Sequence, residues 1–296
     1  GLNKSGEQKP TFEAGIELKA KYTIFAEGAR GHLGKQLISK FNLSEGRQPQ
    51  HYALGLKEIW QLPQDSELHK AGSVLHGAGW PLNETDSSGG SFLYHLENNQ
   101  VVVGLIIDLN YSNPYLSPFD EFQRFKHHPV IRQYLEGGER ISYGARAIAK
   151  GGFDSLPKQQ FPGGLLIGCD AGTLNSGKIK GSHTAMKSGM LAAEAVFDAL
   201  QAGGDQREAN YQSLFESSWL FDELKQSRNF ASSIHKYGAI MGGALATFEQ
   251  NIWQSLFHKE APWTISDPQA DYLSMKEISQ CNAIDYPKPD GKLSFD

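Results

Sequence analysis

An apolar run, a polar loop and a long helix follow one another between residues 163 and 201, and this segment most constrains the fold. The run ends in Gly168-Cys169-Asp170, and the residues from 182 to 200 predict a long helix. One side of that helix carries Met186, Gly189, Ala193, Val196, Phe197 and Leu200. A parallel strand that ends in Gly-x-Asp places a carboxylate at the carboxyl edge of a sheet, where open α/β folds bind ligands. The segment therefore predicts an α/β domain with a candidate ligand site at Asp170.

The long helix begins with amide groups that can hold an anion. Its first residues, 181–184, are expected to face the same sheet edge as Asp170. A helix N-terminus carries roughly half a positive charge and stabilises an anion, such as the N1 and C2-carbonyl side of a reduced flavin. Asp170 would then accept a hydrogen bond from a sugar or ribityl hydroxyl. An α/β crossover with a capped helix and no ligand explains the spacing equally well.

A second strand, turn and helix lies near the start of the chain. Residues 22–26 predict a buried strand, Glu27-Gly28 ends it, and residues 31–41 have the apolar spacing of a helix. These elements form half of a βαβ unit, and an acidic residue before glycine is common where a chain turns past a dinucleotide. Taken alone, the motif is better explained as a glycine turn without a ligand.

The residues between these two segments have the pattern of an antiparallel sheet. Extended runs separated by polar turns occur at 52–62, 72–80, 91–96 and 101–109. A helix is expected at 119–125, and Pro129 interrupts it. We therefore expect a sheet at 51–145 that is inserted into the α/β domain.

Ser88-Gly89-Gly90 is a candidate ligand contact within this sheet. Paired glycines leave backbone N–H and C=O groups open to close approach, as a flat ring with carbonyl acceptors needs. Paired glycines more often form a hairpin turn or a bulge, and spacing alone does not separate the two interpretations.

Charge and composition exclude several classes of function. The chain has 296 residues, a formal net charge of −5 and no run of like charges, which disfavours nucleic acid as a partner. Two cysteines are too few for a four-cysteine cluster, and the histidines lack zinc-ligand spacing. P-loop, G-x-S-x-G and G-x-G-x-x-G motifs are absent, so we assign no catalytic residue and no metal ligand.

An amphipathic segment at 237–257 predicts one of two surfaces. Its apolar stripe at helical spacing consists of Met241, Leu245, Phe248, Ile252 and Leu256. The intervening polar side chains make the segment too polar to span a bilayer. It therefore lies in a membrane interface or packs on the protein's own core, and the pattern supports both equally.

Together these segments resemble one family, the electron transfer flavoprotein-ubiquinone oxidoreductases, which are membrane-bound flavin and iron-sulfur enzymes. The resemblance rests on short motifs in the same order along nearly the whole chain. They include Phe-Ala-Glu-Gly-Ala-Arg-Gly-His-Leu at 25–33, Gly-Trp-Pro-Leu at 79–82, Gly-Gly-Ser-Phe-Leu-Tyr-His-Leu at 89–96, Asn-Pro-Tyr-Leu-Ser-Pro-Phe at 113–119, Lys-Ile-Lys-Gly-Ser-His-Thr-Ala-Met-Lys-Ser-Gly at 178–189 and Tyr-Pro-Lys-Pro-Asp-Gly at 286–291.

The resemblance implies a mixed α/β (α+β) fold, in which part of a Rossmann-like FAD-binding domain carries an inserted antiparallel-sheet domain that binds ubiquinone. It also implies a division of the chain. The FAD-binding domain takes 1–48 and returns at 149–232, the quinone-binding sheet takes 49–148, a membrane-interface helical segment takes 233–260, and 261–296 lead to the iron-sulfur domain.

The family's activity implies the cofactors, the partners and the site residues. Electrons from the reduced electron transfer flavoprotein reach a [4Fe-4S] cluster and FAD, and the flavin reduces ubiquinone at the respiratory membrane. That membrane is the bacterial cytoplasmic membrane or the matrix side of the mitochondrial inner membrane, and the enzyme is peripheral or monotopic on it. The implied contacts are Glu27, Gly28, Asp170, Asn175, Gly181, Ser182, His183 and Thr184 for FAD, and Ser88, Gly89 and Gly90 for the quinone.

The chain departs from the family pattern in two ways. Ser88 stands where the family usually has tyrosine, which puts one phenolic hydrogen bond to the quinone in question. The family's N-terminal G-x-G-x-x-G motif and its cluster cysteines are both absent. We therefore expect the chain to be the middle part of the enzyme, cut from a longer chain, with the cluster ligands outside it, and to bind FAD poorly alone. The alternatives are a geranylgeranyl-reductase-like or other FAD-dependent oxidoreductase, and a non-catalytic truncated membrane-associated module.

Overall fold

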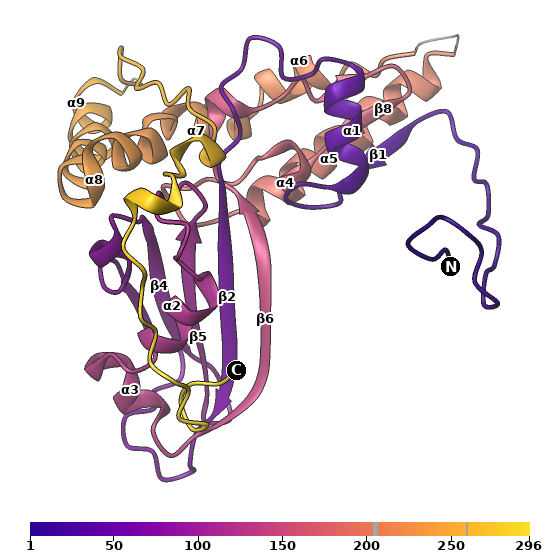
Figure 1. Cartoon of the computed structure of the whole chain (residues 1–296). Coiled ribbons are helices and arrows are strands. Elements are labelled where there is room, and N and C mark those ends of the chain that lie inside the picture. Colours follow the sequence, from indigo (N-terminus) through magenta and orange to yellow (C-terminus); the bar gives the residue numbers. More distant parts are fainter. Residues whose placement is uncertain (204–206, 259) are drawn as a thin grey trace.

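The chain folds around two sheets, which lie one above the other in Figure 1. The computed structural model describes residues 1–203, 207–258 and 260–296. Residues 204–206 and 259, which belong to two of the expected segments, lie outside the described part. The strand orders are β1-β8-β7 in the small sheet and β3-β4-β5-β2-β6 in the large one. The predicted mixed α/β class with an antiparallel sheet is confirmed.

The small sheet carries the two strand-turn-helix segments. β1 (Thr23–Phe25) pairs in parallel with β8 (Gly164–Leu166), and β8 pairs antiparallel with β7 (Gln160–Phe161). The prediction that β1 is buried is wrong. Because β1 is an edge strand with β8 as its one neighbour in this sheet, Ile24 is 40% exposed.

Three helices pack beside this sheet: α1 (His32–Lys40), α4 (Gly168–Ala171) and α5 (Ser182–Gln201). The side of α5 predicted to be apolar is not its buried side, since Met186 is 65% and Phe197 60% exposed. Its buried face consists of Thr184, Ser188, Leu191, Ala192, Ala195 and Ala199. Small residues allow α5 to approach α4 closely, and Ser188 Oγ accepts a hydrogen bond from the Gly168 amide at 2.9 Å.

The large sheet is antiparallel throughout and has five strands. Four of them match the expected extended runs: β2 (Tyr52–Gln61), β3 (Val74–Gly77), β4 (Gly89–His95) and β5 (Gln100–Asp108). The fifth strand, β6 (Glu139–Ala149), pairs with β2 and was not predicted as a separate strand. It is a largely exposed edge strand, so its polar and glycine residues hide the alternation of a half-buried strand.

One face of the large sheet is covered by two helices and by the last residues of the chain (Figure 1). α2 (Pro118–Phe125) starts at Ser117, whose Oγ accepts the Asp120 amide hydrogen bond at 3.3 Å. Pro129 opens the next helix, α3 (Pro129–Leu135), as expected for proline at a first helical position. The apolar core between these layers includes Trp60, Leu105, Ile107, Phe122 and Leu293.

The remaining helices are α6 (Tyr211–Glu216), α7 (Trp219–Gln226), α8 (Asn229–Thr247) and α9 (Gln254–Phe257). The helix predicted at 237–257 is confirmed in outline: α8 continues from its kink at Gly238 (φ +75°) to Thr247, and a π-helical turn at Phe248–Trp253 joins it to α9. Within the described parts of the chain, no helix combines the length and the apolarity that crossing a membrane requires.

Candidate functional site

Asp170 lies at the meeting point of the two strand-turn-helix segments. The strand expected to end at Asp170 stops at Leu166, and Asp170 lies in the short helix α4. Its Oδ2 accepts a hydrogen bond from the Glu27 amide at 3.4 Å. A Cβ at Gly31 or Gly34 would overlap the Asp170 carboxylate, so these glycines allow α1 to approach it. Burial raises the pKa of Asp170.

Glu27 fixes the turn before α1. Its Oε2 accepts hydrogen bonds from the amides of Leu33 (2.8 Å) and Gly34 (2.9 Å), in the first turn of that helix. Gly28 adopts a positive φ of +88°, which glycine favours. The Glu27-Gly28 motif therefore forms the glycine turn between strand and helix that its spacing favoured, and it also brings the Glu27 amide to Asp170.

A pocket of about 330 Å³ opens beside Asp170. Its polar lining includes Arg30, Gln48, Gln50 and Tyr52, so it lies between the small sheet and the start of β2. The Arg30 guanidinium lies 5.8 Å from the centre of the Tyr52 ring, within cation–π range. The pocket thus places a cation, an aromatic ring and a carboxylate around one space.

Two of the other expected flavin contacts, Asn175 and His183, lie around Glu223. Asn175 is buried, and its Nδ2 donates to Glu223 Oε1 at 3.0 Å. His183 contacts the same oxygen at 2.7 Å and stacks on Trp219. Hydrogen bonds from Lys178 and His183 outweigh the effect of burial and lower the pKa of Glu223. Asn175 and His183 therefore hold the loop to α7.

The first turn of α5 remains available to an anion. Gly181 is its N-cap, no acidic residue lies in that turn, and no side chain of the described residues caps it. Ser182, His183 and Thr184 contribute the first amides of the helix. Gly168 lies next to Ala185, with 3.4 Å between Ala185 Cβ and an ideal Cβ on Gly168, so α4 and the start of α5 are neighbours.

Gly89 and Gly90 begin β4 and do not form a hairpin turn. The Asp108 amide donates to the Ser88 carbonyl at 2.9 Å, and antiparallel pairing then alternates. Gly89 therefore directs its own N–H and C=O away from β5, toward the edge where β3 has ended at Gly77 opposite Ser91. A side chain on Gly89 would overlap the Ile106 carbonyl, so only glycine fits here.

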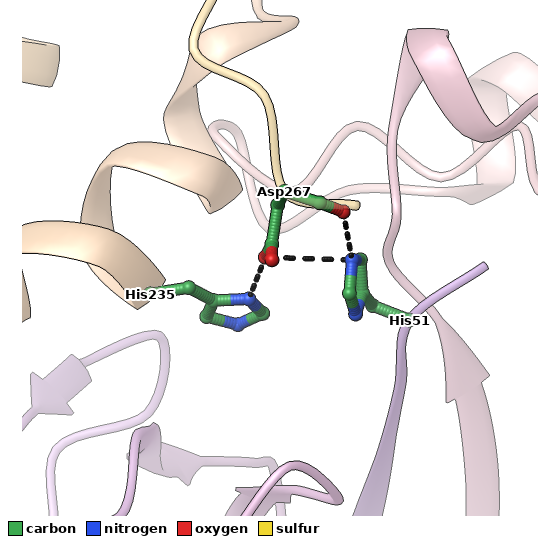
Figure 2. A group of neighbouring side chains, drawn as sticks. All are labelled: His51, His235 and Asp267. Atoms are coloured by element: carbon green, nitrogen blue, oxygen red, sulfur yellow. Dashed lines mark hydrogen bonds and ion pairs between the residues drawn. The ribbon is translucent and has the colours of Figure 1, made fainter. Parts of the chain in front are cut away.

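A network of buried charges starts next to these glycines. Ser88 Oγ donates to Asp108 Oδ2 at 2.6 Å, and Lys150 Nζ contacts Asp108 Oδ1 at 2.6 Å. His235 Nε2 lies 3.3 Å from Asp108 Oδ2, and its Nδ1 lies 2.8 Å from Asp267 Oδ2. Figure 2 shows Asp267 between His235, which comes from α8, and His51, which precedes β2. Six separate segments of the chain therefore meet at one site.

The electrostatics of this network favour a charged His235. Burial alone would lower the pKa of His235, but hydrogen bonds to Asp108 and Asp267 outweigh it and raise the pKa to about 9. Burial would raise the pKa of Asp108, yet Lys150 and His235 hold it well below its usual range. At neutral pH an imidazolium therefore lies between two carboxylates.

His51, His235 and Asp267 are spaced like the ligands of a metal site, but their ligand atoms are already engaged by other groups. One ligand atom each from His51, His235 and Asp267 lie within 4.8 Å of one another. Both nitrogens of His235 already contact carboxylates, and His51 Nδ1 lies 2.7 Å from Asp271 Oδ1. Lys150 supplies a further positive charge. These contacts describe an ion-pair network, and we assign no metal to it.

The network connects the two expected ligand sites. Lys150, which binds Asp108, also offers its carbonyl to Ser176 Oγ at 3.1 Å. Ser176 belongs to the loop that precedes α5, next to Asn175. A continuous set of contacts thus runs from Ser88 through Asp108 and Lys150 to that loop.

An exposed apolar surface lies on α8, α9 and the turn between them. Ile240 is 86% exposed, and the surface also includes Met241, Phe248, Ile252, Leu256 and Phe257. Leu245 is half-buried. Four of the five residues of the predicted stripe therefore face outward, which does not fit packing on the protein's own core.

Comparison with known proteins identifies the family. Residues 52–148 match the family model described as ETF-QO, ubiquinone-binding. The chain is 61% identical over 299 residues to the electron transfer flavoprotein-ubiquinone oxidoreductase of Pseudomonas aeruginosa, covering 100% of this chain and 53% of that protein. The chain belongs to this family. It is also 49% identical to the mitochondrial oxidoreductase of Homo sapiens, covering 100% of this chain and 48% of that protein.

The chain spans about half the length of these oxidoreductases. Among solved structures, the halogenase PltM in complex with ethyl mercury and mercury aligns with a TM-score of 0.50 and 14% identity. That alignment covers 81% of this chain and 50% of the halogenase, and it concerns the fold alone.

Sequence reasoning missed the charged network. Asp108 carried a signal, because an acid that ends the apolar run of β5 is unusual in a buried strand. His235 and Asp267 carried none, since they come from different segments than Asp108 and no short motif joins them.

Proposed function

We propose that this chain forms the quinone-reducing site and part of the flavin site of an oxidoreductase. The complete enzyme passes electrons from reduced electron transfer flavoprotein through a [4Fe-4S] cluster and FAD to ubiquinone, and the cluster ligands lie outside this chain. Identity of 61% along the whole chain supports this assignment over a geranylgeranyl-reductase-like one. The structural observation that carries it is the contact path from Ser88 to Ser176, which joins the candidate quinone and flavin sites.

The residues around Asp170 fit a flavin nucleotide. Bound FAD supplies a carrier that takes up two electrons and releases them singly or in pairs. Asp170 lines a pocket that also holds Arg30 and Tyr52, where it can accept a hydrogen bond from a ribityl hydroxyl. The amides of 182–184 offer partial positive charge to the anionic side of the ring. Asn175 and His183 position these amides through Glu223.

The residues around Gly89 fit a quinone ring. The Gly89 amide faces the sheet edge beyond the end of β3 and can donate to a quinone carbonyl. Gly90 has no side chain to cover the same edge. Ser88 takes the tyrosine position of the family, and its hydroxyl is directed to Asp108.

The apolar surface of α8 and α9 fits a monotopic contact with the respiratory membrane. Several large apolar side chains are exposed together there, more than a water-facing helix usually presents. Because His235 belongs to α8 and contacts Asp108, this helix also adjoins Ser88 and the candidate quinone site. A lipid-soluble quinone can then reach Gly89 from the bilayer.

Quinone-dependent oxidation of reduced electron transfer flavoprotein by the full open reading frame tests the proposal. We expect turnover with ubiquinone and loss of turnover when ubiquinone is omitted. A purified, flavin-loaded enzyme that oxidises the flavoprotein partner without any dependence on quinone would refute the assignment.

The 296-residue chain alone should bind FAD weakly, because its sequence lacks the G-x-G-x-x-G cradle for the pyrophosphate. Titration of the purified chain with FAD, followed by flavin fluorescence, measures this. Stoichiometric yellow protein after gel filtration would contradict the expectation.

A further inference from the structure

We propose that Ser88, Asp108, His235 and Asp267 form a relay that delivers protons to the reduced quinone. The inference rests on the proposed function, since it concerns the same quinone site. Ubiquinone takes up two electrons from the reduced flavoprotein and two protons to become ubiquinol. The electrons come from the flavin side, and the protons must come from water.

One oxygen atom of Asp108 contacts both Ser88 and His235 and so joins the two halves of the relay. Asp108 Oδ2 lies 2.6 Å from Ser88 Oγ and 3.3 Å from His235 Nε2. The other nitrogen of His235 lies 2.8 Å from Asp267 Oδ2. Ser88 adjoins Gly89, where the quinone carbonyl is proposed to bind. A path of side-chain hydrogen bonds therefore leads from Asp267 through both nitrogens of His235 to Asp108 and Ser88, beside the proposed quinone site.

The outer end of this path reaches solvent. A pocket of about 360 Å³ is lined by His51, His235, Asp267 and the exposed Lys236. Asp267 is 19% exposed, whereas the side chains of Asp108 and His235 are nearly inaccessible at 1% and 5%. Water in this pocket can protonate the outer side of the relay, while the inner side stays dry.

Each transfer balances within the relay. As a quinone oxygen gains charge from the flavin electrons, the Ser88 hydroxyl turns toward it and gives up its proton. Asp108 Oδ2 passes the His235 proton to Ser88, and His235 regains one from the pocket through Asp267. The same sequence repeats for the second proton, so no group in the relay is consumed.

The charged neighbours keep a proton available on His235. Asp108 on β5 and Asp267 in the C-terminal segment face its two nitrogens, Lys150 lies beyond Asp108, and His51 contacts Asp267. Burial and Lys150 would lower the pKa of His235, but Asp108 and Asp267 outweigh them and raise it to about 9, so His235 carries a proton at physiological pH.

The test compares two electron acceptors in the full-length, flavin-loaded enzyme. Ubiquinone requires protons, whereas the one-electron acceptor ferricenium does not. We expect His235→Gln to slow ubiquinone reduction by about 10- to 100-fold, in line with the loss of a positioned proton donor. Ferricenium reduction should stay within about twofold. Added imidazole should partly restore ubiquinone reduction, because the pocket opens to solvent.

His69→Gln is the matched control. His69 contacts the carbonyls of Leu96 and Gln100, at the opposite end of β4 from Gly89. Both acceptor rates should remain at the wild-type level in this variant.

Further outcomes decide the inference. Wild-type ubiquinone reduction by His235→Gln, or an equal fall with both acceptors, would overturn the relay. Absence of a solvent deuterium isotope effect on quinone reduction by the wild-type enzyme would also overturn it, and this measurement needs no variant. Asp267→Asn should show the same acceptor selectivity as His235→Gln. Wild-type enzyme without quinone-dependent activity would instead refute the proposed function itself.

Discussion

The charged state of His235 should make the stability of the protein depend on pH in one defined window. The folded protein raises the pKa of this imidazole from 6.5 to about 9 through Asp108 and Asp267. Below pH 6.5 the histidine is protonated in both the folded and unfolded states, so its stabilising contribution is complete. That contribution is lost as the pH rises from 6.5 through about 9.

The size of this effect follows from the two pKa values. A pKa difference of one unit corresponds to about 1.36 kcal/mol, so the rise from 6.5 to about 9 gives about 3 kcal/mol. The side chain is 5% exposed, so solvent screening reduces this value little. The carboxylates that cause the shift have lowered pKa values and stay ionised across the window.

Urea unfolding of the wild type and of His235→Gln at pH 6, 7.5 and 9.5 measures the contribution. The difference in unfolding free energy between the two proteins should be largest at pH 6 and should shrink by about 3 kcal/mol toward pH 9.5. Other titrating groups, such as Lys126, are present in both proteins and cancel. A difference that stays constant from pH 6 to 9.5 would show that His235 is not held as an imidazolium.

Other substitutions test three separate parts of the structure. Gly89→Ala should lower the free energy of unfolding by about 1–3 kcal/mol in urea, because its Cβ would overlap the Ile106 carbonyl. The control Gly90→Ala should cost less, since the nearest atom to its Cβ would lie at 3.3 Å. Equal costs for the two variants would contradict the argument. Lys126→Met removes the buried ion-pair partner of Glu58 at 2.9 Å and leaves it Trp60 and the more distant Arg140, so it should cost about 3 kcal/mol; an unchanged melting temperature would contradict this. Ile240→Glu should weaken binding to phosphatidylcholine–phosphatidylglycerol vesicles about tenfold in flotation assays without changing the melting temperature, and unchanged flotation would exclude this surface from the membrane contact.

Local sequence patterns predicted the strands and helices whose apolar periodicity and proline positions lie within one short segment. The apolar runs of β2 and β5 and the helix expected at 119–125 lie where the sequence indicates, and Pro129 separates α2 from α3. The buried face of α5 could not be predicted in this way. Its small residues pack because α4 approaches closely, and that approach depends on Gly168, which lies 20 residues from its partner Ser188.

The candidate site was harder to predict than the fold. Asp170 was singled out from its motif, but its place in a helical turn follows from contacts with Glu27, 143 residues away. The network around Asp108 depends on His235, which is 127 residues away. A single sequence contains no signal for such pairings, since burial of a charge becomes favourable only after folding brings its partners together.

The C-terminal segment runs across the large sheet and is attached to it at both ends. It places Asp267 and Asp271 beside His51, and further along it inserts Leu293 into the apolar core while Phe295 donates to Gln123. The segment therefore joins the ion pairs around His235 and His51 to the apolar core of the large sheet. Displacing the segment would therefore separate Asp267 from His235 and uncover the core beside Leu293 at the same time.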